Sequence, residues 1–164
     1  MEKAQREKIL RYLEKDSRLS PAEIAVAIGV TEEAAAAEIA KMEAENIICG
    51  YHALVNWHNT DEEDVTALVE LRVTPQGGEG YNKIAREIEE YPQVETLYLM
   101  SGAYDFLVIL HGKSIREISL FISDKLASIN EVQSTTTHFI LTKYKELGVT
   151  LNLHKVDGRM VVTP

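Results

Sequence analysis

The chain has 164 residues, of which 45% are hydrophobic and 26% are charged, and its formal net charge is −9. This length and apolar content allow one sizeable core or two small ones. No apolar run approaches the roughly 20 residues that span a bilayer, and the polar start of the chain does not resemble a secretory signal. The single cysteine, Cys49, excludes an intramolecular disulfide. These features predict a cytoplasmic protein with no membrane association and no metal site.

Three helices are predicted within residues 5–46, each with apolar side chains at helical spacing. Ser20 and Pro21 are typical of the start of the second helix, Gly29 of its end, and Thr31 of the N-cap of the third. The predicted inward residues are Ile9, Leu10, Leu13, Ile24, Ala25, Ile28, Ala35, Ile39 and Met42. Two short helices joined by a glycine turn behind a stabilising helix predict a helix-turn-helix. A trihelical protein-interaction domain would have the same pattern.

The apolar stretch from Ile47 to Trp57 predicts a strand or hairpin, and therefore a wing that completes a winged helix-turn-helix over residues 1–57. Residues 58–64 are polar and acidic. We interpret them as a domain linker because the periodicity changes sharply after them; a surface turn within one domain is the alternative.

Residues 65–150 predict a second domain with the element order β-α-β-β-α-β, the ferredoxin-like arrangement of an α+β protein. The strands are predicted at residues 65–73, 94–100, 104–110 and 132–141. The first helix follows the glycine-rich loop 75–80, and a capping box of Ser114 and Glu117 begins the second. The helix residues expected to face inward are Tyr81, Ile84, Ala85, Ile88, Ile115, Ile118, Ile122 and Leu126.

One face of this sheet would be covered by the two helices, while the other still carries apolar side chains. A second subunit is the simplest cover for that face, so a homodimer is expected. In the tail, residues 151–164, the pair Asp157-Gly158 predicts a two-residue hairpin turn.

Several dispersed motifs resemble those of one family. They are Ala25-x-x-Ile28-Gly29-Val30-Thr31, Ile47-Ile48-Cys49-Gly50-Tyr51, Ser101-Gly102-Ala103-Tyr104-Asp105 and Thr135-Thr136-Thr137. Over about residues 3–150 the chain resembles the Lrp/AsnC, or feast/famine, transcription regulators. The resemblance implies a winged helix-turn-helix that binds promoter DNA and a ligand-sensing domain of the RAM type. It also implies dimers that assemble into tetramers or octamers, and modulation by a small metabolite, with an amino acid as the expected effector.

The resemblance also implies a ligand site near the turn between the second and third strands. Its predicted residues are Met100, Ser101, Gly102, Tyr104, Asp105, Thr135 and Thr137. Exposed backbone N–H groups at Gly102 could bind an α-carboxylate, the Asp105 carboxylate could bind an α-ammonium, and the threonine hydroxyls could complete the lining. As alternatives, Asp105 could be a turn residue that bonds its own backbone, and the threonines could reflect β-propensity alone.

The predicted DNA-binding residues are Arg18, Ser20, Thr31, Glu33, Ala36, Ala37, Lys41, Tyr51 and His52. Residues 31–46, however, contain one Lys against five Glu, a balance of −4, and Ala37, Glu38 and Ala40 stand where family members carry arginines. DNA affinity depends largely on neutralising phosphates, so this helix departs from the expected pattern. Three explanations remain open: DNA binding through Arg6, Arg11, Arg18, Lys41 and the wing, binding of a protein partner, or a purely structural role.

No catalytic residue or cofactor is expected. Sirohaem decarboxylases resemble the same two-domain architecture, so an enzyme is the remaining alternative. The histidines, His52, His58, His111, His138 and His154, show no metal-ligand spacing with one another or with Cys49. Residues 75–80 lack the lysine and the spacing of a phosphate-binding loop.

Overall fold

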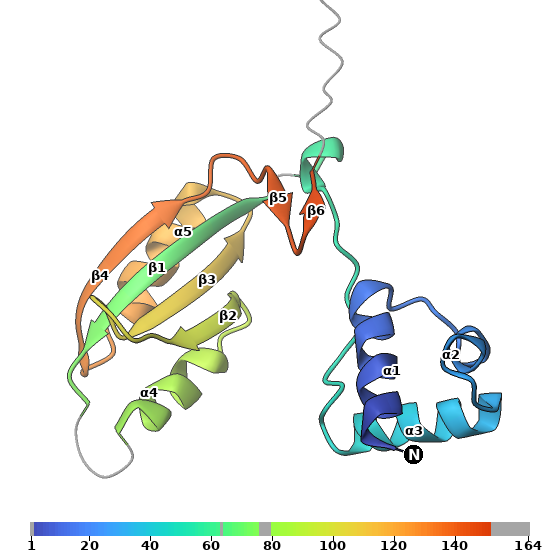
Figure 1. Cartoon of the computed structure of the whole chain (residues 1–164). Helices are drawn as coiled ribbons and strands as arrows, with labels where there is room; N and C mark the ends of the chain where they lie inside the picture. Colours follow the sequence, from blue (N-terminus) through green and yellow to red (C-terminus); the bar gives the residue numbers. More distant parts are fainter. Residues whose placement is uncertain (1, 63, 76–79, 152–164) are drawn as a thin grey trace, which may run out of the picture. The chain divides into compact units, whose positions relative to one another are not determined.

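The computed structural model describes residues 2–62, 64–75 and 80–151 (Figure 1). The chain divides into two compact units, residues 1–55 and 56–164, and each unit is described by itself. The predicted turn at Asp157-Gly158 lies outside the described residues.

The first unit contains three helices: α1 (Lys3–Lys15), α2 (Pro21–Ile28) and α3 (Glu32–Ala44). The predicted ends of α2 are confirmed, because Ser20 and Glu23 form a complete capping box and Gly29 ends the helix with a φ of 73°. Thr31 caps α3 by accepting a hydrogen bond from the backbone of Ala34. The core of the unit consists of Ile9, Leu13, Ile24 and Met42, with Leu10, Leu19, Ile28, Ile39 and Ile48 packed against it. The helix-turn-helix prediction is therefore confirmed as a fold.

The predicted wing is wrong in its secondary structure. Residues 47–56 contain no strand, and the next element is a short 3-10 helix, η1 (Trp57–Asn59). Ile47, Tyr51 and Val55 are exposed, so this stretch does not bury an alternating face. A strand also needs a partner for its backbone hydrogen bonds, and the described part of this unit contains only helices beside it.

The second unit is a four-stranded antiparallel sheet in the order β2-β3-β1-β4 (Figure 1). Its elements are β1 (Val65–Val73), α4 (Gly80–Glu89), β2 (Val94–Leu99), β3 (Phe106–Gly112), α5 (Ile115–Phe121) and β4 (Val132–Phe139). A π-helical turn, η2 (Ile122–Leu126), continues α5. This order confirms the ferredoxin-like prediction.

Both helices pack on one face of the sheet. Buried residues from the helices, from alternate positions of the strands and from the turn before β4 form a single core: Ala67, Val69, Leu71, Val73, Ile84, Ile88, Phe106, Val108, Leu110, Ile118, Ile122, Leu126 and Ile129. The opposite face carries Leu68, Leu107 and Ile109, which are only half-buried. The predicted apolar character of this uncovered face is therefore present.

Two predicted inward residues do not lie in this core. Ile115 is 56% exposed because Ser114 is the N-cap, which makes Ile115 the first residue of α5, and the first residue of α5 to be buried is Ile118. Tyr81 is 36% exposed. The capping box at Ser114 is half formed: Ser114 accepts from the Glu117 backbone, but the Glu117 carboxylate accepts from the backbone of Lys113.

The sequence did not predict a short hairpin that follows β4. It pairs β5 (Lys145–Glu146) with β6 (Val149–Thr150). Its two turn residues, Leu147 and Gly148, have φ values of 45° and 82°. Two successive positive φ angles are the requirement of the turn that joins the strands, and leucine is an unusual residue for the first position.

Candidate functional site

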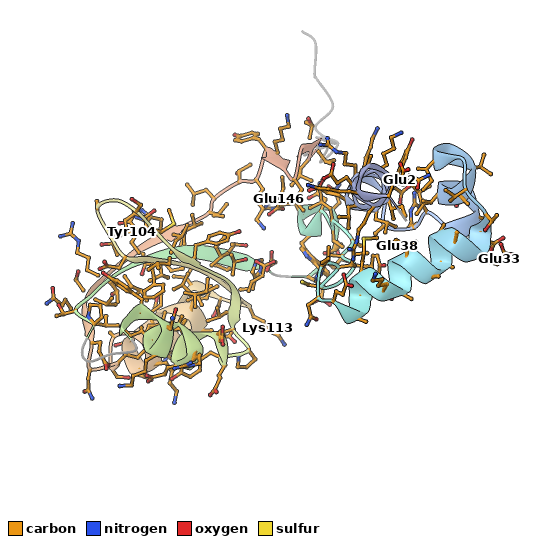
Figure 2. All side chains as sticks on the ribbon, turned by 60° about the horizontal axis from the view of Figure 1, so that its bottom comes forward. Glu2, Glu33, Glu38, Tyr104, Lys113 and Glu146 are labelled. Carbon is orange, nitrogen blue, oxygen red and sulfur yellow. The ribbon has the colours of Figure 1, made fainter. Side chains whose placement is uncertain are left out.

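The acidic helix α3 directs part of its charge into its own domain. Ala35, Glu38 and Met42 are its buried residues, whereas Glu33, Ala37 and Lys41 are exposed. Figure 2 shows Glu33 at the N-terminal end of α3, away from Glu38. The surface that α3 presents outward is therefore poorer in carboxylates than the sequence alone suggests.

Arg6 of α1 offsets two of these carboxylates. Its Nε lies 3.1 Å from Glu38 Oε1, with the Glu38 side chain only 11% exposed, and its Nη2 donates to Glu45. The buried carboxylate thus has a cation beside it, as a charge in a low-dielectric site requires. Arg6 is therefore engaged within the domain, which weakens its predicted role as a phosphate contact.

Tyr51 engages a third carboxylate of α3. Its hydroxyl donates to Glu43 Oε1 over 2.7 Å. Burial, followed by this hydrogen bond and the Glu43 charge, raises the pKa of Tyr51 to about 12. The remaining acids, Glu32 and Glu33, lie in the first turn of α3, where the helix dipole favours negative charge.

The other predicted DNA-binding residues fall into two groups. Ser20 and Thr31 use their hydroxyls as helix caps, and Arg18 forms a forked contact to Asp16 at 3.1 and 3.2 Å. The hydrogen bonds from Arg18 lower the pKa of Asp16. In contrast, Glu33, Ala37, Lys41 and His52 are exposed and Ala36 is half-buried. Lys41 is therefore the predicted DNA-binding residue of α3 that presents an exposed cation. Its Nζ lies 3.8 Å from Glu45 Oε1.

The turn between β2 and β3 is held in place by Asp105. Its Oδ2 accepts from the backbone N–H of Val73 at 2.8 Å, and its Oδ1 accepts from the Tyr81 hydroxyl at 3.1 Å. The Asp105 N–H also donates to the carbonyl of Leu71. These bonds attach the turn to β1 and α4, so Asp105 does not bond its own backbone through its side chain. The hydrogen bond to Asp105 raises the pKa of Tyr81.

This anchoring leaves the front of the turn open. Ser101, Gly102 and Ala103 are exposed, and Met100 and Tyr104 are half-buried. A Cβ added at Gly102 would meet no atom within 4 Å, so the backbone of the turn can be approached closely from that side. The structure thus brings residues 100–105 together as one exposed turn on a fixed base.

The two predicted threonines lie apart from this turn. Thr135 pairs with Leu71 and Thr137 with Val69, so both point to the helix-covered face and both are half-buried. Strand β1 lies between β4 and β3, and two interstrand spacings separate the threonines from β3 by on the order of 10 Å. Within one subunit, a small ligand would therefore have to cross β1 to contact both groups.

His111, which shows no metal-ligand spacing in the sequence, lies between two carboxylates. His111 Nδ1 is 2.9 Å from Asp64 Oδ1, and its Nε2 is 2.5 Å from Glu95 Oε2. These residues come from three segments, so no local pattern could have predicted the cluster. Within residues 2–62, 64–75 and 80–151, no group of three His, Cys, Asp or Glu side chains could hold a metal ion. The helices of the described part are all too short or too polar to cross a membrane.

The structure thus combines a helix-turn-helix unit with a ferredoxin-like domain, the two-domain arrangement expected from the sequence. Family models match both parts of the chain, as the AsnC-type helix-turn-helix domain over residues 7–43 and the Lrp/AsnC ligand binding domain over residues 66–150. The chain belongs to the Lrp/AsnC family of transcriptional regulators, which confirms the family and the main function expected from the sequence.

The matches to individual relatives extend over nearly the whole chain. The chain is 40% identical to YugG, an uncharacterized HTH-type transcriptional regulator of Bacillus subtilis, over 95% of each chain. Among solved structures, LrpC of Bacillus subtilis is 25% identical, with a TM-score of 0.63, and covers 86% of this chain and 95% of its own. A Neisseria meningitidis regulator, solved as an L-Met complex, has a TM-score of 0.69 at 21% identity and covers 94% and 97%. At that identity the likeness concerns the fold.

Proposed function

We propose that this regulator binds a free amino acid at the turn 100–105 and that this binding changes its affinity for promoter DNA. The observation that supports this proposal best is the anchoring of the turn by Asp105, which leaves Ser101, Gly102 and Ala103 exposed. Backbone N–H groups at the turn would bind the α-carboxylate. The Neisseria meningitidis relative, solved with L-Met, makes an amino acid the first class of effector to test.

Asp105 has a double role in this proposal. Both of its oxygens already accept one hydrogen bond, but each carboxylate oxygen can accept two. It could therefore hold the turn and still accept from an α-ammonium. Thr135 and Thr137 would reach such a ligand from another subunit, or from the far side of β1, rather than from beside the turn.

The DNA-binding half of the proposal rests on α3 and its surroundings. Lys41, His52 and the backbone at the start of α3 would approach the DNA. Glu38 and Glu45 would instead be paired with Arg6, and Glu43 with Tyr51.

Pairing of the half-buried sheet face between subunits would give a homodimer, and further assembly to a tetramer or octamer would add avidity. Residues 58–64 would serve as the linker. The protein would act by binding in the cytoplasm, without catalysis or a cofactor.

A gel-shift assay with the DNA upstream of the protein's own gene tests this function. We expect retardation that weakens as salt rises from low to physiological concentration, and a change in retardation when the effector is added. A thermal-shift screen of the free amino acids would identify the effector. Binding of an amino acid without retardation at either salt would contradict the DNA-binding half and favour a protein partner for α3.

A further inference from the structure

The uncovered face of the sheet carries two histidines. Along β3, His111 follows the buried Leu110 and therefore shares its side of the sheet with Ile109. On β4, His138 pairs with Leu68 and lies on the same face. Both histidines thus belong to the surface through which the proposed homodimer would form.

His111 is held between two carboxylates that come from separate segments. Asp64, just before β1, has its Oδ1 2.9 Å from Nδ1 of the ring. Glu95, where the pairing of β2 with β3 is irregular, has its Oε2 2.5 Å from Nε2. The Nε2 atom is buried, and no described group is aligned to hydrogen-bond to it. His111 also borders a cavity beside α5, whose other charged lining residues are Glu117, Asp124 and Lys125.

A neutral ring cannot satisfy both carboxylates at His111. A neutral imidazole carries a proton on one ring nitrogen and a lone pair on the other. If Nδ1 donates to Asp64, the lone pair of Nε2 faces the Glu95 carboxylate and repels it, and the other tautomer repels Asp64 in the same way. The imidazolium has an N–H on each nitrogen and attracts both carboxylates. His138 has one such neighbour, since its Nε2 lies 3.3 Å from Glu70 Oε1.

The charge of the uncovered face depends on these two histidines. With both rings neutral, three carboxylates against one guanidinium on and beside the face give −2: Asp64, Glu70 and Glu95 against Arg72. A two-fold dimer would bring two copies of this surface together. Like charges would then meet away from water, where their repulsion is screened least. One proton on each histidine brings the sum to zero.

We propose that protons taken up by His111 and His138 strengthen the pairing of two copies of this chain through the uncovered sheet face. This inference rests on the homodimer of the proposed function and adds its regulation by pH. Histidine is the side chain whose charge ordinarily changes between about pH 5 and pH 8. As the pH falls through this range, a proton binds the free nitrogen of each ring, the neighbouring carboxylates gain a donor, and the two faces no longer repel each other.

Sedimentation velocity of the full chain over a dilution series, at about pH 6 and about pH 8 and constant ionic strength, measures the dimer dissociation constant. Where the dimer persists at every dilution, subunit exchange between two populations labelled at the exposed Cys49 measures its dissociation rate. An exposed ion pair contributes up to about fivefold in affinity, and a two-fold dimer contains each contact twice. The dimer should therefore be about tenfold or more tighter at the lower pH.

Variants locate the effect. The double variant His111→Gln/His138→Gln should lose most of the pH dependence. Glu95→Gln, at a side chain that is 58% exposed, should remain folded and should dimerise more tightly at the higher pH, because it removes a repelled carboxylate. The matched control is His52→Gln, which makes the same change at an exposed residue of the first unit and should behave like the parent chain.

The outcomes separate this inference from the proposed function. Equal affinity at both pH values, or full pH dependence in the double variant, would overturn the inference and leave the homodimer in place. A chain that stays monomeric at both pH values would overturn the homodimer and the inference together. Amino-acid binding and gel retardation are measured separately and would stand in either case.

Discussion

Arg6 of α1 places its Nε 3.1 Å from the Oε1 of Glu38 on α3, across the middle of the helix-turn-helix. This ion pair, with the further contact from Arg6 to Glu45, joins the first helix to the helix that would face DNA. It explains how an acidic α3 is compatible with an intact domain, because the carboxylate that points inward has a cation beside it.

We expect Arg6→Ala to lower the free energy of unfolding by about 1–3 kcal/mol, since it leaves Glu38 buried and without that cation. Urea unfolding of Arg6→Ala, Glu38→Ala and the double variant measures the coupling, and the double variant should lose less than the sum of the two. Lys3→Ala, which breaks the exposed pair with Glu7, is the control and should change stability by less than about 0.5 kcal/mol. Strictly additive losses would contradict the pairing.

Asp105→Ala should destabilise the second unit by about 1–3 kcal/mol, because it leaves the buried Val73 N–H without an acceptor and removes the bond from Tyr81. Tyr81→Phe, which removes only the second bond, should lower the free energy of unfolding by less than Asp105→Ala does. Denaturant unfolding followed by circular dichroism measures both, with Ser101→Ala at the exposed front of the turn as the control. An Asp105→Ala loss no larger than that of Tyr81→Phe would show that the Val73 bond contributes little.

The Tyr51 phenol should titrate near pH 12, and the ultraviolet titration difference between the parent chain and Tyr51→Phe isolates it. Folding raises the pKa of the Tyr51 phenol. The stability that the neutral phenol contributes is therefore fully present below its ordinary pKa of about 10 and is lost as the pH rises through about 12. Glu43→Gln should move the pKa part of the way back, because burial is the larger cause. An unchanged titration in Glu43→Gln would rule out the hydrogen bond as a cause.

Lys41→Ala should weaken DNA binding for all sequences and reduce the slope of log affinity against log salt by about 1, because one phosphate contact is lost. Filter binding or fluorescence anisotropy at several salt concentrations measures this slope. Lys113→Ala removes the same charge from an exposed position of the second unit and should leave the slope unchanged. A normal slope in Lys41→Ala would place the DNA away from this side of α3.

Leu147→Asn should stabilise the β5–β6 hairpin by up to about 1 kcal/mol. Asparagine tolerates the positive φ of this position, which is strained for leucine, and Asn-Gly is a preferred turn pair. Leu147 is 86% exposed, so little packing within the subunit would be lost. Hydrogen exchange of the hairpin amides measures the effect, and Gly148→Ala, at a φ of 82°, should act in the opposite direction. A loss of stability in Leu147→Asn would mean that Leu147 packs against another subunit.

Local features of the sequence determined where most elements begin and end. Ser20, Gly29 and Thr31 act within three or four residues of their own positions, and the alternation in β1 identifies its buried face directly. The order of the elements was then enough to predict the ferredoxin-like topology of the sheet, since few topologies join two β-α-β halves. The family motifs could likewise be read along the chain.

Tertiary structure alone decided what the functional side chains contact. Among the described residues of its unit, the predicted wing has no strand to pair with. The register of β4 with β1 directs the side chains of Thr135 and Thr137 to the helix-covered face. Asp105 and Val73 are 32 residues apart, and their hydrogen bond exists only because β1 and β3 are adjacent. The ion pair of Arg6 with Glu38 likewise depends on how α1 packs against α3. Caps and alternation are short-range effects of the backbone, whereas these pairings depend on which surfaces meet after folding.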